Sequence, residues 1–80
     1  MILESMIIKG LNNGIVKLIP CPHAQDEIVC KIGEYWFYFD DRNGKSILEK
    51  IMSTLYYFAT DDNFIDEYNY YYAILVNMED

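Results

Sequence analysis

Short apolar runs, separated by glycine, proline and polar residues, fill the first forty positions of the chain. Residues 2–9 and 15–19 are rich in Ile, Val and Leu, which favour strands. Residues 10–14 lie between these runs and end in Asn13-Gly14, a pair that tolerates positive φ and favours a tight hairpin turn. The pattern therefore predicts that the chain opens with two strands joined as a hairpin.

A second hairpin is predicted after residues 20–23, where two prolines interrupt the sheet. Residues 27–32 and 35–40 are its strands, and Gly33-Glu34 forms a two-residue turn in which Gly33 supplies the unusual φ. By the two-residue period of a strand, the core side of this hairpin consists of Ile28, Cys30, Ile32, Tyr35, Phe37 and Phe39. The opposite face carries Val29, Lys31, Trp36 and Tyr38.

Helical periodicity begins after a polar loop at residues 40–45. Ser46 and Glu49 have the spacing of a capping box, in which Ser46 caps the helix and Glu49 reaches back to the backbone N–H of the cap. The predicted helix runs to about residue 59, and its buried stripe consists of Ile47, Leu48, Ile51, Met52, Leu55, Phe58 and Ala59. Residues 60–63 supply a second cluster of capping side chains.

The last segment, from about residue 62, fits two patterns. Its apolar residues fall at helical spacing, and Asp66 and Glu67 suit the first turn of a helix. Residues 70–76 nevertheless have strong β propensity, so a strand within 68–77 is the alternative. With the helix preferred, the chain is predicted to be an α+β domain in which an antiparallel sheet of about four strands is followed by two helices packed on one face, in the order ββββαα.

Charge is distributed unevenly along the chain, whose formal net charge is −7. Residues 1–50 carry seven acidic and six basic side chains, whereas the acids of residues 51–80 have no Lys or Arg among them: Asp61, Asp62, Asp66, Glu67, Glu79 and Asp80. Such a surface repels nucleic acid, which is itself a polyanion. A basic protein groove is a complementary partner, because opposite potentials accelerate encounter and fix orientation. The alternative is that the charge serves solubility alone.

Few residues carry catalytic or metal-binding chemistry. Cys21, His23 and Cys30, with Asp26 as a fourth candidate, lack the paired knuckle or His pair of zinc sites, so no metal or cofactor is expected. The lone histidine has no orienting partner for a Cys–His nucleophile, capping explains the paired carboxylates, and no phosphate-binding Gly-rich loop is present. We therefore expect a protein that is not an enzyme.

The location expected for the protein is the cytoplasm. No apolar run approaches the roughly 20 residues of a membrane span, and residues 1–5 lack the basic start of a signal peptide. Two cysteines are too few for a secreted disulfide framework, so both thiols are expected to be free, with Cys30 in the core. Residues 1–80 are long enough for one domain.

Aromatic residues are the second candidate for recognition. Eight of the 80 residues are Tyr, and six of these lie between Tyr56 and Tyr72. Tyr68 and Tyr71, with Tyr72, are expected in the core. A set that falls off the apolar faces is expected to be partly exposed and, with the acidic residues, to bind a partner: Trp36, Tyr38, Tyr57 and Tyr70.

Residues 28–75 carry a sequence of features that leads to a family resemblance. Gly33-Glu34-Tyr35 ends a hairpin turn, a short polar loop leads to Ser46-Ile47-Leu48-Glu49-Lys50-Ile51, and an acidic stretch runs from Asp61 to Glu67. This order resembles the small acidic anti-CRISPR proteins that phages use against type II RNA-guided nucleases. The chain differs from their pattern by beginning with predicted strands instead of a leading helix, and its acidic stretch is sparser.

The resemblance implies a three-stranded sheet with helices, and a protein that presents carboxylates where duplex DNA would sit on the nuclease. Its phosphate mimics would be Asp61, Asp62, Asp66 and Glu67. A phage-encoded protein of this kind would act in the cytoplasm of the bacterial host.

Three functions fit these observations. The leading hypothesis is a non-catalytic inhibitor whose acidic, Tyr-rich C-terminal half fills the basic groove of a nucleic-acid-handling protein as a DNA mimic. An immunity protein that neutralises a basic toxin would need the same surface. A structural homodimer would instead hide the face of Trp36 and Tyr38 against its own copy.

Overall fold

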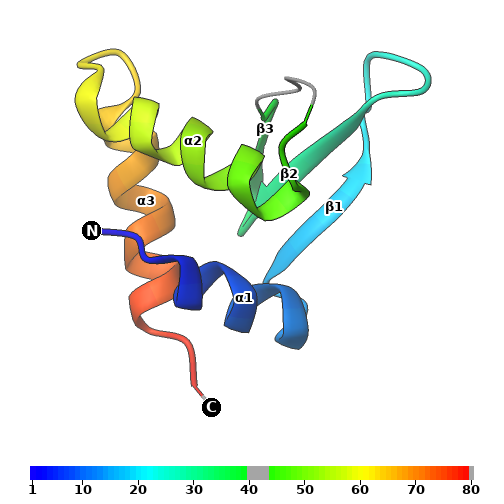
Figure 1. The fold of residues 1–80 in the computed structure, drawn as a ribbon. Helices are drawn as coiled ribbons and strands as arrows, with labels where there is room; N and C mark the ends of the chain where they lie inside the picture. Colours follow the sequence, from blue (N-terminus) through cyan, green and yellow to red (C-terminus); the bar gives the residue numbers. More distant parts are fainter. Residues whose placement is uncertain (40–43, 80) are drawn as a thin grey trace.

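An antiparallel sheet and the helices packed against it make up the computed structural model, which describes residues 1–39 and 44–79 (Figure 1). Within these residues the elements are α1 (Glu4–Asn13), β1 (Val16–Pro20), β2 (Ile28–Ile32), β3 (Tyr35–Phe37), α2 (Ile47–Thr60) and α3 (Ile65–Val76). The predicted α+β class is confirmed. The predicted count is wrong, because the described residues form three strands and three helices instead of four strands and two helices.

The first predicted strand, residues 2–9, is wrong, because residues 4–9 form the start of helix α1 and residues 2–3 precede it. Ile7 and Gly10 are buried three positions apart, which is a helical repeat and not the two-residue repeat of a strand. A Cβ on Gly10 would run into the Val16 side chain, so the missing side chain lets α1 approach β1. Gly14, with φ of 84°, ends the helix in the left-handed conformation. The Asn13-Gly14 pair predicted as a hairpin turn is therefore a helix terminus.

The other predicted strands are present with small shifts in their ends. β1 pairs with β2, and β2 pairs with β3 through a register in which Cys30 lies opposite Phe37 and Ile32 opposite Tyr35. Gly33 has φ of 70° in the turn. The predicted two-residue turn is confirmed, and so is its register as far as β3 extends. β3 ends at Phe37, which is shorter than predicted. Residues 40–43, most of the predicted polar loop, lie outside the described residues.

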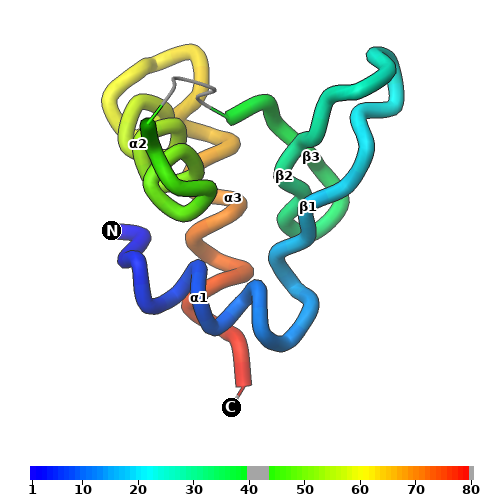
Figure 2. Tube along the Cα trace, turned by 45° about the vertical axis from the view of Figure 1, so that its right-hand side comes forward, coloured from blue at the N-terminus to red at the C-terminus, as the bar shows by residue number. Residues whose placement is uncertain are grey.

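All three helices lie to one side of the sheet (Figure 2). They enclose a core drawn from every element: Ile2, Ile7, Val16, Cys30, Ile32, Phe37, Ile51, Leu55, Phe58, Tyr71 and Leu75. The chain start joins this core, since the backbone N–H of Ile2 donates to the Tyr68 hydroxyl at 2.7 Å. Tyr35 and Ile28, which were predicted on the core side, are at the ends of the paired region and are exposed.

Helix α2 begins at its predicted cap, and part of its predicted apolar stripe is buried. The Ser46 Oγ accepts from the Glu49 backbone N–H at 3.1 Å, and Glu49 Oε1 accepts from the Ser46 N–H at 3.3 Å. Ile51, Leu55 and Phe58 are buried, whereas Ile47 is exposed and its predicted burial is wrong.

The last segment is helical from Ile65 to Val76, as preferred from its spacing, although the helix begins later than the predicted residue 62, and the strand alternative is wrong. Helix α3 begins at Ile65 after Phe64, whose side chain makes no capping hydrogen bond. The predicted cap cluster works differently. Asp61 ends α2, and its Oδ1 accepts from the Asn63 backbone N–H at 2.8 Å within the connection to α3.

Candidate protein-binding surface

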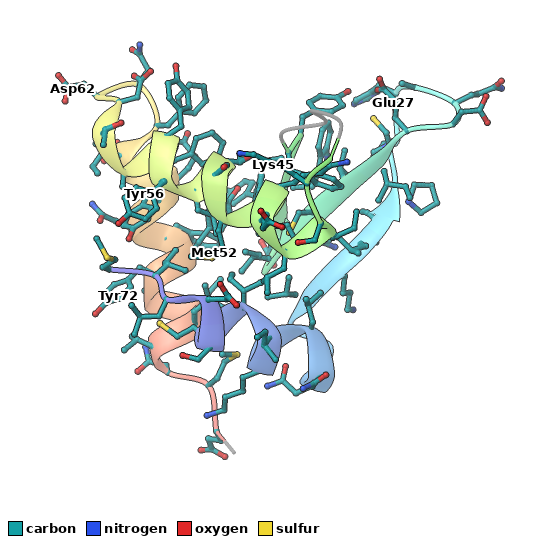
Figure 3. All side chains as sticks on the ribbon, viewed as in Figure 1. Glu27, Lys45, Met52, Tyr56, Asp62 and Tyr72 are labelled. Carbon is teal, nitrogen blue, oxygen red and sulfur yellow. The ribbon has the colours of Figure 1, made fainter. Side chains whose placement is uncertain are left out.

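The short connection between α2 and α3 gathers the acidic residues predicted to bind a partner. Asp61 and Asp62 lie in the connection itself, and Asp66 and Glu67 occupy the first turn of α3. Asp62, Asp66 and Glu67 are exposed, and Figure 3 shows Asp62 directed away from the body of the molecule. Carboxylates at a helix start are favoured by the positive end of its dipole, so the fold tolerates their mutual repulsion there.

Asp61 differs from the other three carboxylates because it is half-buried and has partners inside the chain. The Tyr57 hydroxyl donates to it, and the Asn63 backbone N–H donates as well, and both hydrogen bonds lower its pKa. The same contact raises the pKa of Tyr57. Asp61 therefore shapes the connection between the helices, and Asp62, Asp66 and Glu67 present charge to solvent.

We call residues 61–67, the α2–α3 connection with the first turn of α3, the acidic turn. Aromatic rings extend from it into the core. The rings of Phe58 and Phe64 stack with centroids 4.7 Å apart and planes 11° apart. Tyr57 is 54% exposed, and its ring centroid lies 5.9 Å from that of Phe64. Phe64 is partly exposed, and Phe58, against which it stacks, is buried. The acidic turn is therefore also an aromatic surface.

A groove of about 440 Å³ opens where this turn meets the edge strand β3. Its lining consists of Tyr35, Trp36, Phe37, Phe58, Phe64, Glu67 and Tyr71. Two predicted binding residues from distant parts of the sequence, Trp36 and Glu67, thus line one groove. We call it the aromatic groove.

Tyr70, which was predicted to bind a partner, is half-buried against the β2–β3 turn. Its hydroxyl accepts from the Glu34 backbone N–H at 3.0 Å, and its ring meets that of Tyr35 edge-on at 5.0 Å. Gly33 packs so closely beneath it that an added Cβ would lie 2.6 Å from the Tyr70 oxygen. This placement gives Tyr70 a structural role.

Trp36 and Tyr38 lie on the sheet face opposite the helices, as predicted, where the loop between β1 and β2 also lies. The Tyr38 hydroxyl is 3.1 Å from the Cys21 Sγ, and the His23 ring is 5.8 Å from that of Trp36. Trp36 is half-buried, whereas Tyr38 is exposed. The chain's own β1–β2 loop therefore covers part of this face.

The cysteines and the histidine do not come together. Among the described residues no three His, Cys, Asp or Glu side chains are grouped as a metal site would require. Both thiols are free. Cys30 is in the core, as predicted, and burial raises its pKa to about 12. The Tyr38 hydroxyl and the backbone N–H groups of His23 and Ala24 lower the pKa of Cys21.

Several groove residues were missed by sequence reasoning. Tyr35 was assigned to the core face of its strand, and Phe58 and Phe64 to apolar helical stripes. One signal was available in α3, where Phe64, Glu67 and Tyr71 follow one another at intervals of three and four residues. That spacing places a carboxylate between two rings on one helical face.

No helix in the described part of the chain has the length and apolar character needed to cross a membrane. Comparisons of the chain with models of known families, with curated proteins and with solved structures find no match.

Proposed function

We propose that the protein is a non-catalytic inhibitor that binds the basic, nucleic-acid-binding surface of another protein. The observation that carries the proposal is the acidic turn, where Asp62, Asp66 and Glu67 are exposed beside Tyr57 and Phe64. No Lys or Arg occurs from residue 51 to the end of the chain to neutralise these carboxylates locally.

The two kinds of side chain serve different steps of binding. Carboxylates that occupy a groove lined with Lys and Arg replace the phosphate contacts of nucleic acid, and their field accelerates encounter with that groove. Exposed aromatic rings add contact area at low conformational entropy cost, which slows dissociation. A surface with both properties favours a basic protein partner and repels free nucleic acid.

The order of elements also supports the resemblance to anti-CRISPR proteins. A helix precedes a sheet of three strands, and helices follow it, which removes one of the two differences noted from the sequence. An RNA-guided nuclease is therefore the first candidate partner. A fold hosts many functions, so the proposal depends on the surface and not on this order.

The experiment begins by capturing the partner from the native host with the intact protein and identifying it. Affinity is then compared for wild type and for a variant with Asp62→Lys and Asp66→Lys, two exposed residues that leave Asp61 and its hydrogen bonds unchanged. We expect roughly tenfold or greater loss of affinity, mainly through slower association, and weaker wild-type binding as salt is raised.

The matched control is Glu27→Lys with Glu79→Lys, which makes the same change in net charge far from the acidic turn. Glu27 lies in the β1–β2 loop, distant from Asp62 in Figure 3, and both control residues are exposed. Thermal melting of each variant checks that the fold is retained. Equal affinities of the two variants, or binding that is insensitive to salt, would contradict the proposal. If the captured partner is a basic toxin, the same binding surface is supported, but the protein is an immunity protein and not an inhibitor of a nuclease.

A further inference from the structure

The aromatic groove combines a deep apolar floor with exposed walls. Phe37, Phe58 and Tyr71 are buried and close its base. Their rings are in contact, with Phe37 at 5.4 Å from Phe58 and 5.2 Å from Tyr71. Tyr35 and Phe64 stand at the rim with part of their surface in solvent. The floor is therefore held by core packing, and the walls remain available to a ligand.

The chemistry of the lining selects for positive charge. Aromatic faces carry the negative part of the ring quadrupole and attract cations. Glu67 is the charged residue among those that line the groove. Burial and the nearby charge of Glu67 raise the pKa of Tyr71 to about 12, so its hydroxyl stays neutral. A phosphate or carboxylate ligand would meet repulsion from Glu67 and from the acidic turn.

Among protein cations, the guanidinium group matches this lining better than an ammonium group. It is planar, it stacks on aromatic faces, and it pairs with a carboxylate through two parallel hydrogen bonds. The ammonium group of lysine is a compact, strongly hydrated charge, which lacks the planar face for stacking.

We propose that the aromatic groove binds an arginine side chain of the partner protein, stacked against the groove rings and paired with Glu67. The proposal rests on the proposed function, since a basic nucleic-acid-binding surface is where such an arginine would be found. It adds a specific anchor to an interface otherwise described by charge, and it assigns Trp36 and Glu67 to the same contact.

Trp36 is the one tryptophan of the chain and one of the residues that line the groove, so its fluorescence serves as the probe, although its ring also contacts that of His23 on the opposite sheet face. Wild type is titrated with the blocked tripeptide Gly-Arg-Gly and with its neutral analogue, in which citrulline replaces arginine. We expect a saturable change with the arginine peptide, with a dissociation constant on the order of 1 mM. The citrulline peptide should bind at least roughly fivefold more weakly, because it keeps the shape and loses the charge.

A third titration with Gly-Lys-Gly separates planar recognition from charge alone. Lysine binding as tight as arginine binding would overturn the assignment of arginine, and so would equal binding of the citrulline peptide. The absence of any saturable change with the arginine peptide would overturn the proposal outright. Amide shifts in an NMR titration should map to β3 and the start of α3, and shifts confined elsewhere would contradict the site.

The variant Glu67→Gln should weaken binding of the arginine peptide roughly tenfold and leave the citrulline peptide unchanged. Its matched control is Glu79→Gln, an exposed carboxylate outside the groove, which should bind as wild type does. A folded Glu67→Gln protein that binds the arginine peptide normally would exclude the pairing with Glu67.

Failure of this inference can be told from failure of the proposed function. One outcome is that the arginine peptide does not bind while the variant with Asp62→Lys and Asp66→Lys still has lower affinity for the captured partner. In that case the role of the acidic surface is supported and the arginine site is contradicted. If the arginine peptide binds but affinity for the partner changes neither with salt nor with charge reversal, the arginine site is supported and the proposed inhibitor function is contradicted.

Discussion

Gly33 serves the hairpin turn and the packing of α3 at the same time. Its φ of 70° is a conformation that residues with a Cβ avoid. An added Cβ would also collide with Ile74 Cδ1 and with the Tyr70 hydroxyl oxygen. One glycine thus permits both the β2–β3 register and the contact that holds the aromatic edge of the sheet against α3.

The substitution Gly33→Ala is expected to cost about 2–5 kcal/mol in the free energy of unfolding, from backbone strain plus overpacking. Gly14→Ala is the matched control, because Gly14 has φ of 84° and no heavy atom within 4 Å of an added Cβ. That control should cost only the backbone strain, about 1–2 kcal/mol. Urea unfolding measures both, and equal losses would show that Gly33 is not a packing contact.

The hydrogen bond from Tyr57 to Asp61 makes the stability of the fold depend on pH in the acidic range. Because the pKa of Asp61 is lowered in the folded protein, its contribution is present above the ordinary Asp value of about 3.9 and is lost as the pH falls through the folded value. Tyr57→Phe should lower the melting temperature near neutral pH, and the difference from wild type should shrink below about pH 4.

Tyr56→Phe is the control for that prediction. Tyr56 is 55% exposed, much as Tyr57 is, and its hydroxyl faces the Met1 sulfur at 3.8 Å instead of a carboxylate. Its variant should follow wild type at every pH. A Tyr57→Phe protein whose deficit stays constant from pH 7 to pH 3 would show that the hydrogen bond to Asp61 carries no charge-dependent stability.

At the scale of elements, α2 shows how one face of a helix is selected. Ile51 has 0% of its surface exposed and Ile47, one turn earlier, has 39%. Ile51→Ala is expected to cost about 2–5 kcal/mol, through lost burial and the cavity that remains. Ile47→Ala, the same chemical change, should cost under about 1 kcal/mol because the side chain is already partly in water. Comparable losses on urea unfolding would contradict the orientation of the helix.

Helix α1 shows what local preference could not reveal. Isoleucine favours strands only weakly, and neighbours decide the outcome. Gly10 fits against Val16, and Ile7 enters the core between the sheet and the other helices. Gly10 and Val16 both belong to residues 2–19, which were predicted to form one hairpin. Their contact instead packs helix α1 against strand β1.

At the scale of the whole molecule, the sheet face that carries Trp36 and Tyr38 bears on the oligomeric state, because an uncovered apolar face favours binding of a second copy. His23 and Cys21 of the chain's own loop already lie against these two residues, so less apolar surface remains to drive self-association. We expect a monomer by light scattering at high protein concentration. A dimer that is lost in Tyr38→Ser would favour the homodimer and place this face in its interface.

The sequence by itself determined the features that depend on neighbouring residues. The Gly33-Glu34 turn, the register beside it and the Ser46 capping box follow from interactions within a few positions and were predicted correctly. So was the burial of Ile51, Leu55 and Phe58 along α2, whereas that of Ile47 was not. The concentration of acidic residues near Asp61 to Glu67 was likewise visible as composition.

Only the tertiary structure decided which elements the apolar runs become and which side chains meet. Residues 4–9 are helical because packing outweighs a propensity difference below about 1 kcal/mol per residue. Trp36 and Glu67 are 31 positions apart, and no local rule relates them. The aromatic groove exists because α3 docks beside the edge strand β3, and that docking is set by the shape of the shared core.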